Sequence, residues 1–259
     1  MDLMLQEKVY IVTGGAKGIG AATSELIASL GGFVVIVDRD GKSNDLLVSE
    51  IKRKGGEASA IAIDLTLPES ADRAVGFATE TYGLLNGLVN NAGINDTVGL
   101  ESGSLDGFEQ SLRKNLFHYY AMTRNALPFL KKSKGSIVNI SSKTAETGQG
   151  HTSGYVAAKG AINALTREWA VELLKYSVRV NCVIPAEVWT PLYEWFIGQG
   201  DSPEEAKEAI MQKIPFEKRF TTPLEIANTI VFLLSKRSSH TTGQLIHVDG
   251  GYTHLDRMI

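Results

Sequence analysis

Short apolar runs rich in β-branched residues alternate along the chain with longer stretches whose apolar residues recur at helical spacing. Several of these runs are apolar throughout, which favours strands of a parallel sheet covered on both faces. Strands are predicted at residues 9–12, 33–37, 59–63, 87–89, 136–140, 177–183 and 245–248. Helices are predicted between them, for example at 19–30, 70–82, 153–174 and 223–234. The alternation predicts an α/β fold with a doubly wound, mostly parallel seven-stranded sheet and helices on both faces.

The stretch from 190 to 220 departs from this regular alternation because it contains Pro191, Pro203 and Pro215. It lies between two strand–helix units late in the chain, so we predict a helical insertion that forms a lid over the site. No linker rich in proline, glycine, serine or charge interrupts the sequence, and 259 residues suit one large domain. We therefore predict a single domain over residues 1–259.

Composition and charge narrow the classes of function. Lysine and arginine total 26 and aspartate and glutamate 29, so the formal net charge is −3. These charges are spread along the chain, which disfavours a nucleic-acid partner. The apolar runs are too short to cross a bilayer, and we expect no signal peptide. Cys182 is the only cysteine, so an intrachain disulfide is excluded, and we expect a cytoplasmic protein without membrane partners.

A glycine-rich turn, Thr-Gly-Gly-Ala-Lys-Gly-Ile-Gly, occupies residues 13–20 between the first predicted strand and the first helix. Glycines there let the chain turn tightly and bring backbone N–H groups close to a pyrophosphate at a helix N-terminus. The turn lacks the Gly-Lys-Ser/Thr ending of a Walker-type phosphate loop. This context predicts a dinucleotide site in a Rossmann-type fold, with a plain glycine-rich turn as the alternative.

Asp38 ends the second predicted strand, roughly 20 residues after the glycine turn. A carboxylate in this place accepts hydrogen bonds from the adenosine ribose hydroxyls and repels a 2′-phosphate, which favours NAD. Lys17 and Arg39 are nearby cations that weaken this preference, so NADP is not excluded. The alternative for Asp38 is a solvated residue in a turn at the strand end.

Ser142, Tyr155 and Lys159 are the most informative group of polar residues. Tyr155 and Lys159 are four residues apart on a predicted helix and so share a face. A phenol with a pKa near 10 is ~4 kcal/mol from its ionised form at pH 7. A lysine ammonium ~6 Å away stabilises the tyrosinate by roughly 2–3 kcal/mol at an effective dielectric of ~20. The group predicts a general acid and base, and a packed ring beside a solvated amine is the alternative.

Asn115 interrupts a predicted helical stretch, in which asparagine is a poor helix former, and it indicates a local break. Together with this residue, the motifs resemble those of the short-chain dehydrogenase/reductase family over essentially the whole chain. The matches follow the order of the family: residues 13–20, residues 90–93, Asn115, Ser142, Tyr155, Lys159, Asn181, Pro185 and residues 248–251. One departure is Ala186 after Pro185, where the family usually has glycine, and a negative φ at this position would accommodate it.

The resemblance implies an Asn–Ser–Tyr–Lys tetrad. Tyr155 is then the general acid and base, and Ser142 hydrogen-bonds the substrate oxygen. Lys159 lowers the pKa of Tyr155 and holds the nicotinamide ribose, while Asn115 positions a water molecule for proton transfer. The cofactor-binding residues that follow from the motifs and the resemblance are Gly14, Lys17, Gly18, Ile19, Gly20, Asp38, Asp64, Leu65, Asn91, Ala92, Gly93, Tyr155, Lys159, Pro185, Val188 and Thr190.

Segments on the expected substrate side, within residues 141–150 and 185–193, are similar to those of aldose dehydrogenases of the L-fucose type in this family. This similarity implies that the anomeric C1 hydroxyl of an aldose is oxidised to a lactone and its hydride passes to the nicotinamide cofactor. Polar groups bind sugar hydroxyls and an aromatic ring covers the apolar face. The candidate substrate residues are Ser142, Gln149, Tyr155, Glu187 and Trp189, although Trp189 alternatively only packs the insertion.

Two alternatives within the family are a 3-oxoacyl-thioester reductase that takes acyl carrier protein and another alcohol or polyol dehydrogenase. The reductase would favour NADPH and need a basic patch for its acidic carrier, against which Asp38 and the net charge argue. A nucleotide-sensing protein without activity is disfavoured because it does not need the tetrad.

No metal site is expected, since Cys182 is alone and the five histidines show no ligand spacing. The resemblance also implies a homotetramer built through the helix after Asn115 and the helix that carries Tyr155.

Overall fold

The computed structural model describes residues 3–200 and 202–255 of the chain. Within these residues, one seven-stranded sheet has the order β3-β2-β1-β4-β5-β6-β7, and every strand pair in it is parallel. The strands are β1 (Val9–Thr13), β2 (Phe33–Asp38), β3 (Glu57–Ala62), β4 (Gly87–Asn90), β5 (Ser136–Ile140), β6 (Arg179–Pro185) and β7 (Leu245–Val248). The predicted doubly wound sheet is confirmed, and the strand order reverses between β1 and β4.

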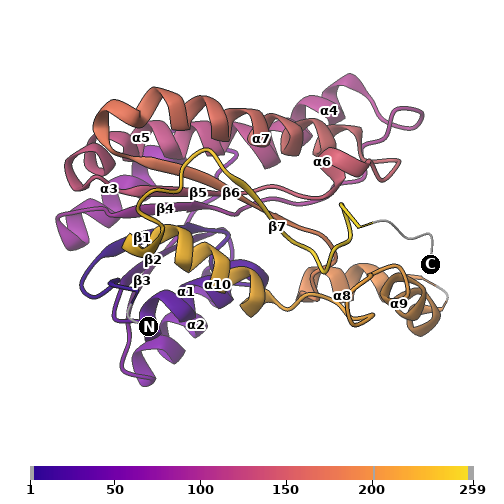
Figure 1. Cartoon of the computed structure of the whole chain (residues 1–259), viewed down its shortest axis with the longest axis horizontal. Coiled ribbons are helices and arrows are strands. Elements are labelled where there is room, and N and C mark those ends of the chain that lie inside the picture. The colour runs from indigo at the N-terminus through magenta and orange to yellow at the C-terminus, as the bar shows by residue number, and fades with distance from the viewer. Residues whose placement is uncertain (1–2, 201, 256–259) are drawn as a thin grey trace.

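Helices cover both faces of the sheet. One face carries α1 (Gly18–Ser29), α2 (Gly41–Arg53) and α10 (Pro223–Leu234), and the other carries α3 (Ser70–Tyr82), α5 (His118–Ser133) and α7 (Ser153–Leu173) (Figure 1). The remaining elements are α4 (Leu105–Leu112), η1 (Arg113–Phe117), α6 (Thr144–Thr147), η2 (Leu174–Tyr176), α8 (Pro191–Ile197), α9 (Pro203–Met211) and η3 (Lys236–Ser238). In the part of the chain that is described, we find no helix with the length and apolar character needed to span a membrane.

The central strands are apolar throughout because both of their faces are buried. Val9 and Ile11 of β1 pack in a cluster under α3, α5 and α7, whereas Tyr10 and Val12 pack in a second cluster with residues of α1 and α10. Successive side chains of a strand point to opposite faces, so each face needs its own apolar residues. This double burial fixes the register of the sheet and hence the position of every strand end.

The stretch from 190 to 220 forms α8 and α9, which lie together beyond the end of the sheet (Figure 1). Ile197, Ile214 and Phe220 are buried in a small apolar cluster, and Trp189 and Tyr193 pack against it. The segment therefore has its own core and does not extend the two clusters of the sheet. Movement of this segment as a lid stays a prediction.

Candidate active site at the carboxyl edge of the sheet

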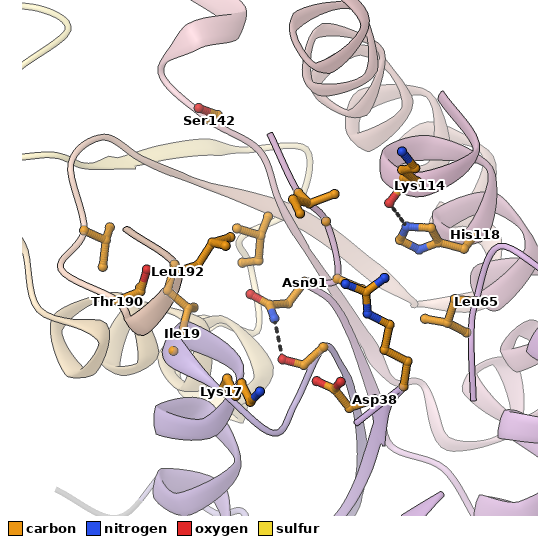
Figure 2. A pocket seen from close by; sticks show the side chains of 18 of the residues that line it. Lys17, Ile19, Asp38, Leu65, Asn91, Lys114, His118, Ser142, Thr190 and Leu192 are labelled. Atoms are coloured by element: carbon orange, nitrogen blue, oxygen red, sulfur yellow. Dashed lines mark hydrogen bonds between the residues drawn. The ribbon is translucent and has the colours of Figure 1, made fainter. Parts of the chain in front are cut away.

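A cavity of about 580 Å³ opens where the strand order reverses, beyond the carboxyl ends of β1, β2, β4, β5 and β6. In doubly wound sheets, this edge is where ligands bind. Figure 2 shows Ser142, Thr190 and Leu192 on one side of the cavity, and Leu65 and His118 on the other. The cavity brings together most residues predicted from the sequence: Gly14, Lys17, Gly18, Ile19, Asp38, Asp64, Leu65, Asn91, Ala92, Gly93, Ser142, Tyr155, Lys159, Pro185, Val188 and Thr190.

The glycine turn forms one wall of the cavity. Gly14 and Gly18 have φ angles of 59° and 54°, in the left-handed region that favours glycine. Lys17 precedes α1 without a side-chain cap, so the N–H groups of the first helical turn remain available to an anion. Gly20, predicted to bind the cofactor, does not line the cavity. A Cβ atom on Gly20 would lie 2.0 Å from the carbonyl oxygen of Gly14, so this glycine allows close packing beneath the turn.

Asn91, which follows β4, holds the glycine turn in place. Its side-chain amide donates hydrogen bonds to the carbonyl oxygens of Thr13 and Gly14, at 3.0 Å and 3.1 Å, one of which is drawn as a dashed line in Figure 2. In return, the Thr13 hydroxyl accepts hydrogen bonds from the backbone N–H groups of Asn91 and Ala92. These contacts join the ends of β1 and β4 into one rigid rim on the cofactor side of the cavity.

The carboxylate of Asp38 lies in the cavity at the end of β2 and accepts hydrogen bonds from the backbone N–H groups of Ala16 and Asp40. Lys17 forms an ion pair of 2.6 Å with Asp40. A hydrogen bond from Lys17 holds the pKa of the Asp40 carboxyl well below its usual range. One of the two cations that weaken the preference for NAD is therefore paired with a carboxylate.

His118, from the first turn of α5, lines the cavity but has no signal in the sequence. Its Nε2–H donates to the carbonyl oxygen of Lys114 at 2.8 Å, which leaves Nδ1 as a buried acceptor without a partner. Burial lowers the pKa of His118 to about 4, so the ring is neutral at pH 7. Together with the uncapped start of α1, this acceptor fits a ligand that carries both anionic oxygens and an N–H donor, as a nicotinamide dinucleotide does.

Tyr155 and Lys159 meet at the inner end of the cavity. The ammonium nitrogen of Lys159 lies 5.5 Å from the centre of the Tyr155 ring and donates to the carbonyl oxygen of Ile140 at 2.7 Å. It also donates to the hydroxyl of Tyr119 at 3.2 Å. Ser142 lies two residues beyond Ile140 and lines the same cavity. The three predicted residues therefore share one environment.

Burial opposes the fall in the pKa of Tyr155 that the neighbouring ammonium predicts. Burial raises the pKa of Tyr155 to about 12, and a hydrogen bond with Ser142 lowers it only in part. Burial also lowers the pKa of Lys159 to about 8. The prediction allowed for the nearby ammonium but not for the loss of water around the phenol, and a lowered pKa with the oxidised cofactor bound stays a prediction.

Asn115 lies in η1, a π-helical turn, so the local break predicted from the sequence is confirmed. Its side chain is fully buried behind the cavity, where Oδ1 accepts a hydrogen bond from the backbone N–H of Ile94 at 2.7 Å and Nδ2 donates to the carbonyl oxygen of Ser111. A Cβ atom on Gly93 would lie 2.9 Å from this Oδ1. Asn115 thus anchors the chain after β4 against η1.

Of the predicted substrate residues, Gln149 is exposed and, like Glu187 and Trp189, does not line the cavity. Glu187 forms a shielded ion pair with Lys143 and accepts a hydrogen bond of 2.5 Å from the hydroxyl of Tyr193. Tyr193 does line the cavity. Glu187 is therefore connected to the cavity through Tyr193. It lies behind the cavity wall, where the buried ammonium of Lys143 is the partner of its carboxylate.

Lys143 and Tyr252 belong to the same region and were missed by the sequence reasoning. The ammonium nitrogen of Lys143 lies 3.6 Å from the centre of the Tyr252 ring. Ala186 is the departure from the family pattern. It lines the cavity, and its φ angle is not positive. The loop after β6 thus accommodates alanine as expected.

The glycine turn, the acidic end of β2 and the Ser–Tyr–Lys group around one cavity define a nicotinamide-dependent oxidoreductase. A family model described as enoyl-(acyl carrier protein) reductase matches residues 14–253. The chain belongs to the short-chain dehydrogenase/reductase family, whose members are NAD(P)-dependent oxidoreductases.

Two relatives with different activities have similar sequence identities to this chain. The chain is 34% identical over 250 residues to 3-oxoacyl-[acyl-carrier-protein] reductase of Thermotoga maritima, covering 96% of this chain and 99% of the relative. It is 36% identical over 245 residues to L-fucose dehydrogenase of Bos taurus, covering 94% and 88%.

Two solved structures are similar over the whole fold. Cj0485 dehydrogenase superimposes with a TM-score of 0.94 at 47% identity, covering 100% of this chain and 99% of that chain. Ligand-free aldohexose dehydrogenase of Thermoplasma acidophilum superimposes with a TM-score of 0.88 at 30% identity, covering 98% and 97%.

The substitution Tyr155→Phe tests the assigned general base. We expect a loss of roughly 10²- to 10⁴-fold in the rate of alcohol oxidation, with binding of the reduced cofactor retained in a fluorescence titration. In the unmodified protein, kcat/KM for oxidation should rise with pH between about pH 6 and pH 8. The reason is that burial raises the pKa of Tyr155 to about 12, so the ionised fraction of the base grows with pH over this range.

Tyr82→Phe, at a partly buried tyrosine outside the cavity, is the matched control and should leave both the rate and the pH profile unchanged. A Tyr155→Phe protein with the rate of the control would remove Tyr155 from the catalytic role.

Proposed function

We propose that the protein is an NAD-dependent dehydrogenase that oxidises the anomeric C1 hydroxyl of an aldose of the L-fucose type to a lactone. The observation that carries the substrate class is the hydroxyl of Tyr193 in the cavity wall, which is held from behind by the ion pair of Lys143 and Glu187. The side chains of Lys143 and Glu187 are only 9% and 12% exposed. This shielded pair fixes the Tyr193 hydroxyl in position, and together with Ser142 this hydroxyl gives the substrate side polar groups that can bind sugar hydroxyls.

Aromatic rings complete this side of the site. Trp189, Tyr193 and Phe220 pack together, with ring centres 4.9 Å apart for Trp189 and Phe220 and 5.4 Å apart for Tyr193 and Phe220. Tyr193 alone of the three lines the cavity, where its ring offers an apolar surface of the kind that the C–H face of a sugar contacts. A fatty acyl chain would instead need a continuous apolar groove, with which a shielded ion pair next to Ser142 agrees poorly.

Some relatives of this chain act on sugars, which supports a sugar substrate. The sequence identities alone, however, do not separate a sugar from an acyl thioester. L-fucose dehydrogenase and 3-oxoacyl-[acyl-carrier-protein] reductase match this chain about equally, at 36% and 34% identity. A solved aldohexose dehydrogenase shares the fold at 30% identity. The Tyr193 hydroxyl, held in the cavity wall by the shielded ion pair behind it, therefore supplies the reason to prefer the sugar over the acyl thioester.

In the proposed reaction, Tyr155 removes the proton of the C1 hydroxyl as the C1–H bond breaks. Ser142 donates a hydrogen bond to the substrate oxygen and so aligns it with the phenol. A bound nicotinamide ring supplies the hydride acceptor. Lys159, held by Ile140 and Tyr119, adds the positive charge that favours the tyrosinate as it forms. The product is a lactone, and the proton leaves from Tyr155.

The substrate class is tested by steady-state kinetics. We expect NAD-dependent turnover with L-fucose, D-arabinose or L-galactose, followed as reduced cofactor, and no NADPH oxidation with acetoacetyl-CoA. Turnover of acetoacetyl-CoA but of none of the sugars would establish the reductase instead. Activity with neither would remove the sugar assignment.

NAD is the proposed cofactor because the carboxylate of Asp38 lies in the cavity and Lys17 is paired with Asp40. For Asp38→Ser, we expect the NAD-to-NADP ratio of kcat/KM to fall about 30-fold, which corresponds to ~2 kcal/mol of repulsion between unit charges ~8 Å apart at an effective dielectric of ~20. Adding Asp40→Ala should lower the ratio further, because it releases the cation of Lys17 toward a 2′-phosphate.

Asp45→Ser, in the middle of α2 and outside the cavity, is the matched control for this charge removal and should leave the ratio unchanged. An Asp38→Ser protein whose ratio equals that of the control would mean that Asp38 does not select the cofactor.

We propose a homotetramer as the assembly, through α5 and α7. Large apolar side chains are exposed on these helices: Tyr120 at 56% and Val171 at 68%. Burial of such a surface between copies is favourable. We expect Val171→Asp to lower the mass measured by light scattering from a tetramer to a smaller species. Leu67→Asp, comparably exposed at 60% but away from these helices, should remain tetrameric, and a monomeric parent protein would contradict the proposal.

A further inference from the structure

Glu146, His247 and His254 come together from three separate parts of the fold: α6, β7 and the segment after β7. Nε2 of His247 lies 3.1 Å from Oε2 of Glu146, and Nε2 of His254 lies 3.2 Å from Nε2 of His247. The distance from Nε2 of His254 to Oε2 of Glu146 is 3.9 Å. Two imidazole nitrogens and a carboxylate oxygen therefore form a compact triangle outside the catalytic tetrad.

This triangle has nearly the size of one face of a tetrahedral zinc site. Zn–N and Zn–O bonds of ~2.0–2.1 Å at tetrahedral angles place neighbouring ligand atoms ~3.3–3.4 Å apart. Two imidazoles and one carboxylate are a known zinc ligand set, and imidazole nitrogen favours zinc over magnesium or calcium, which prefer oxygen. The side chain of His254 is 62% exposed and that of Glu146 28%, so solvent can supply a fourth ligand.

Hydrogen bonds account for only part of this arrangement. Nε2 of His247 and Oε2 of Glu146 are within hydrogen-bond distance. Nε2 of His254, however, lies 3.3 Å from Nδ1 and 3.2 Å from Nε2 of His247, almost equally far from both. The lone pairs of those two nitrogens diverge in the ring plane, so one N–H cannot be directed at both. The two rings meet edge to face, with centres 4.2 Å apart, and a cation shared by the three residues would give each of them one directed bond once the rings rotate.

The backbone on either side of the cluster is held in place. His247 is in register with Ile184 of the neighbouring strand β6. The carboxylate of Asp249 accepts hydrogen bonds from the backbone N–H groups of Gly251 and Thr253, both at 2.9 Å. These two bonds turn the chain back on itself, so that His254 returns to His247. The histidines are thus brought together by the fold of this segment as well as by their own contact.

The cluster adjoins the wall beside the catalytic serine. Glu146 lies on α6, four residues after Ser142, and Tyr252 of the same returning segment covers Lys143. Lys143 in turn pairs with Glu187, which accepts the hydrogen bond of Tyr193 in the cavity wall. An ion at the cluster would join the returning segment to α6 and so hold Tyr252 over Lys143.

We propose that Glu146, His247 and His254 bind a zinc ion, with water as the fourth ligand, and that the ion fastens the segment after β7 to α6. The expectation that the chain holds no metal rested on spacing along the sequence. Glu146 and His247 are 101 residues apart, so no local motif reveals the cluster.

Calorimetric titration with zinc chloride tests this site in the full-length chain, free of any polyhistidine tag and stripped of metal with a chelator. We expect one zinc ion per chain and a higher unfolding temperature with zinc than without it. Glu146→Gln and His254→Ala should each weaken this binding at least ~10-fold and abolish the thermal shift. Neither position is buried, and circular dichroism verifies that both variants fold.

His240→Ala removes another exposed histidine outside the cluster and should bind zinc as the parent protein does. Cobalt(II) provides an independent measurement, because four-coordinate cobalt absorbs visible light far more strongly than six-coordinate cobalt. Zinc affinity in His254→Ala equal to that of the parent, or only the weak spectrum of six-coordinate cobalt, would overturn the proposal.

Discussion

The buried ammonium group of Lys159 is the constraint on which the geometry of the catalytic end depends. Lys159 is 3% exposed, and a buried cation without partners is strongly destabilising. Its partners are the carbonyl oxygen of Ile140, at the end of β5, and the hydroxyl of Tyr119 on α5, which itself donates to the same carbonyl. One charge therefore joins α5, α7 and β5. Tyr155, one turn earlier on α7, is thereby directed into the cavity beside the chain that follows β5.

Burial of the tyrosine itself opposes its ionisation. In the protein alone, burial raises the pKa of Tyr155 to about 12 and lowers that of Lys159 to about 8. A tyrosinate in this environment needs more positive charge than one partly shielded ammonium supplies. Further positive charge in the cavity, such as that of an oxidised nicotinamide ring, would favour the tyrosinate and so couple proton removal to the bound cofactor.

The sequence predicted the scaffold well because each part of it has a local cause. Strands buried on both faces read as apolar runs, and the predicted β5 and β7 have the bounds found in the structure. The glycine turn is visible because only glycine adopts the φ angles at residues 14 and 18 without strain. Asn115 marked a real π-helical turn. The candidate cofactor residues consequently line one cavity, apart from Gly20, whose small size serves the packing beneath it.

The substrate side was predicted less well because its contacts join segments that are distant in sequence. Lys143, Glu187 and Tyr252 meet only after the loops beyond β5, β6 and β7 have folded against one another. No periodicity relates these three positions. A family resemblance predicts the catalytic tetrad more reliably than the residues that surround the substrate. A 3-oxoacyl-[acyl-carrier-protein] reductase and an L-fucose dehydrogenase accordingly match this chain about equally well, at 34% and 36% identity. Specificity in such a fold depends on a few charged and aromatic side chains, which change without disturbing the sheet.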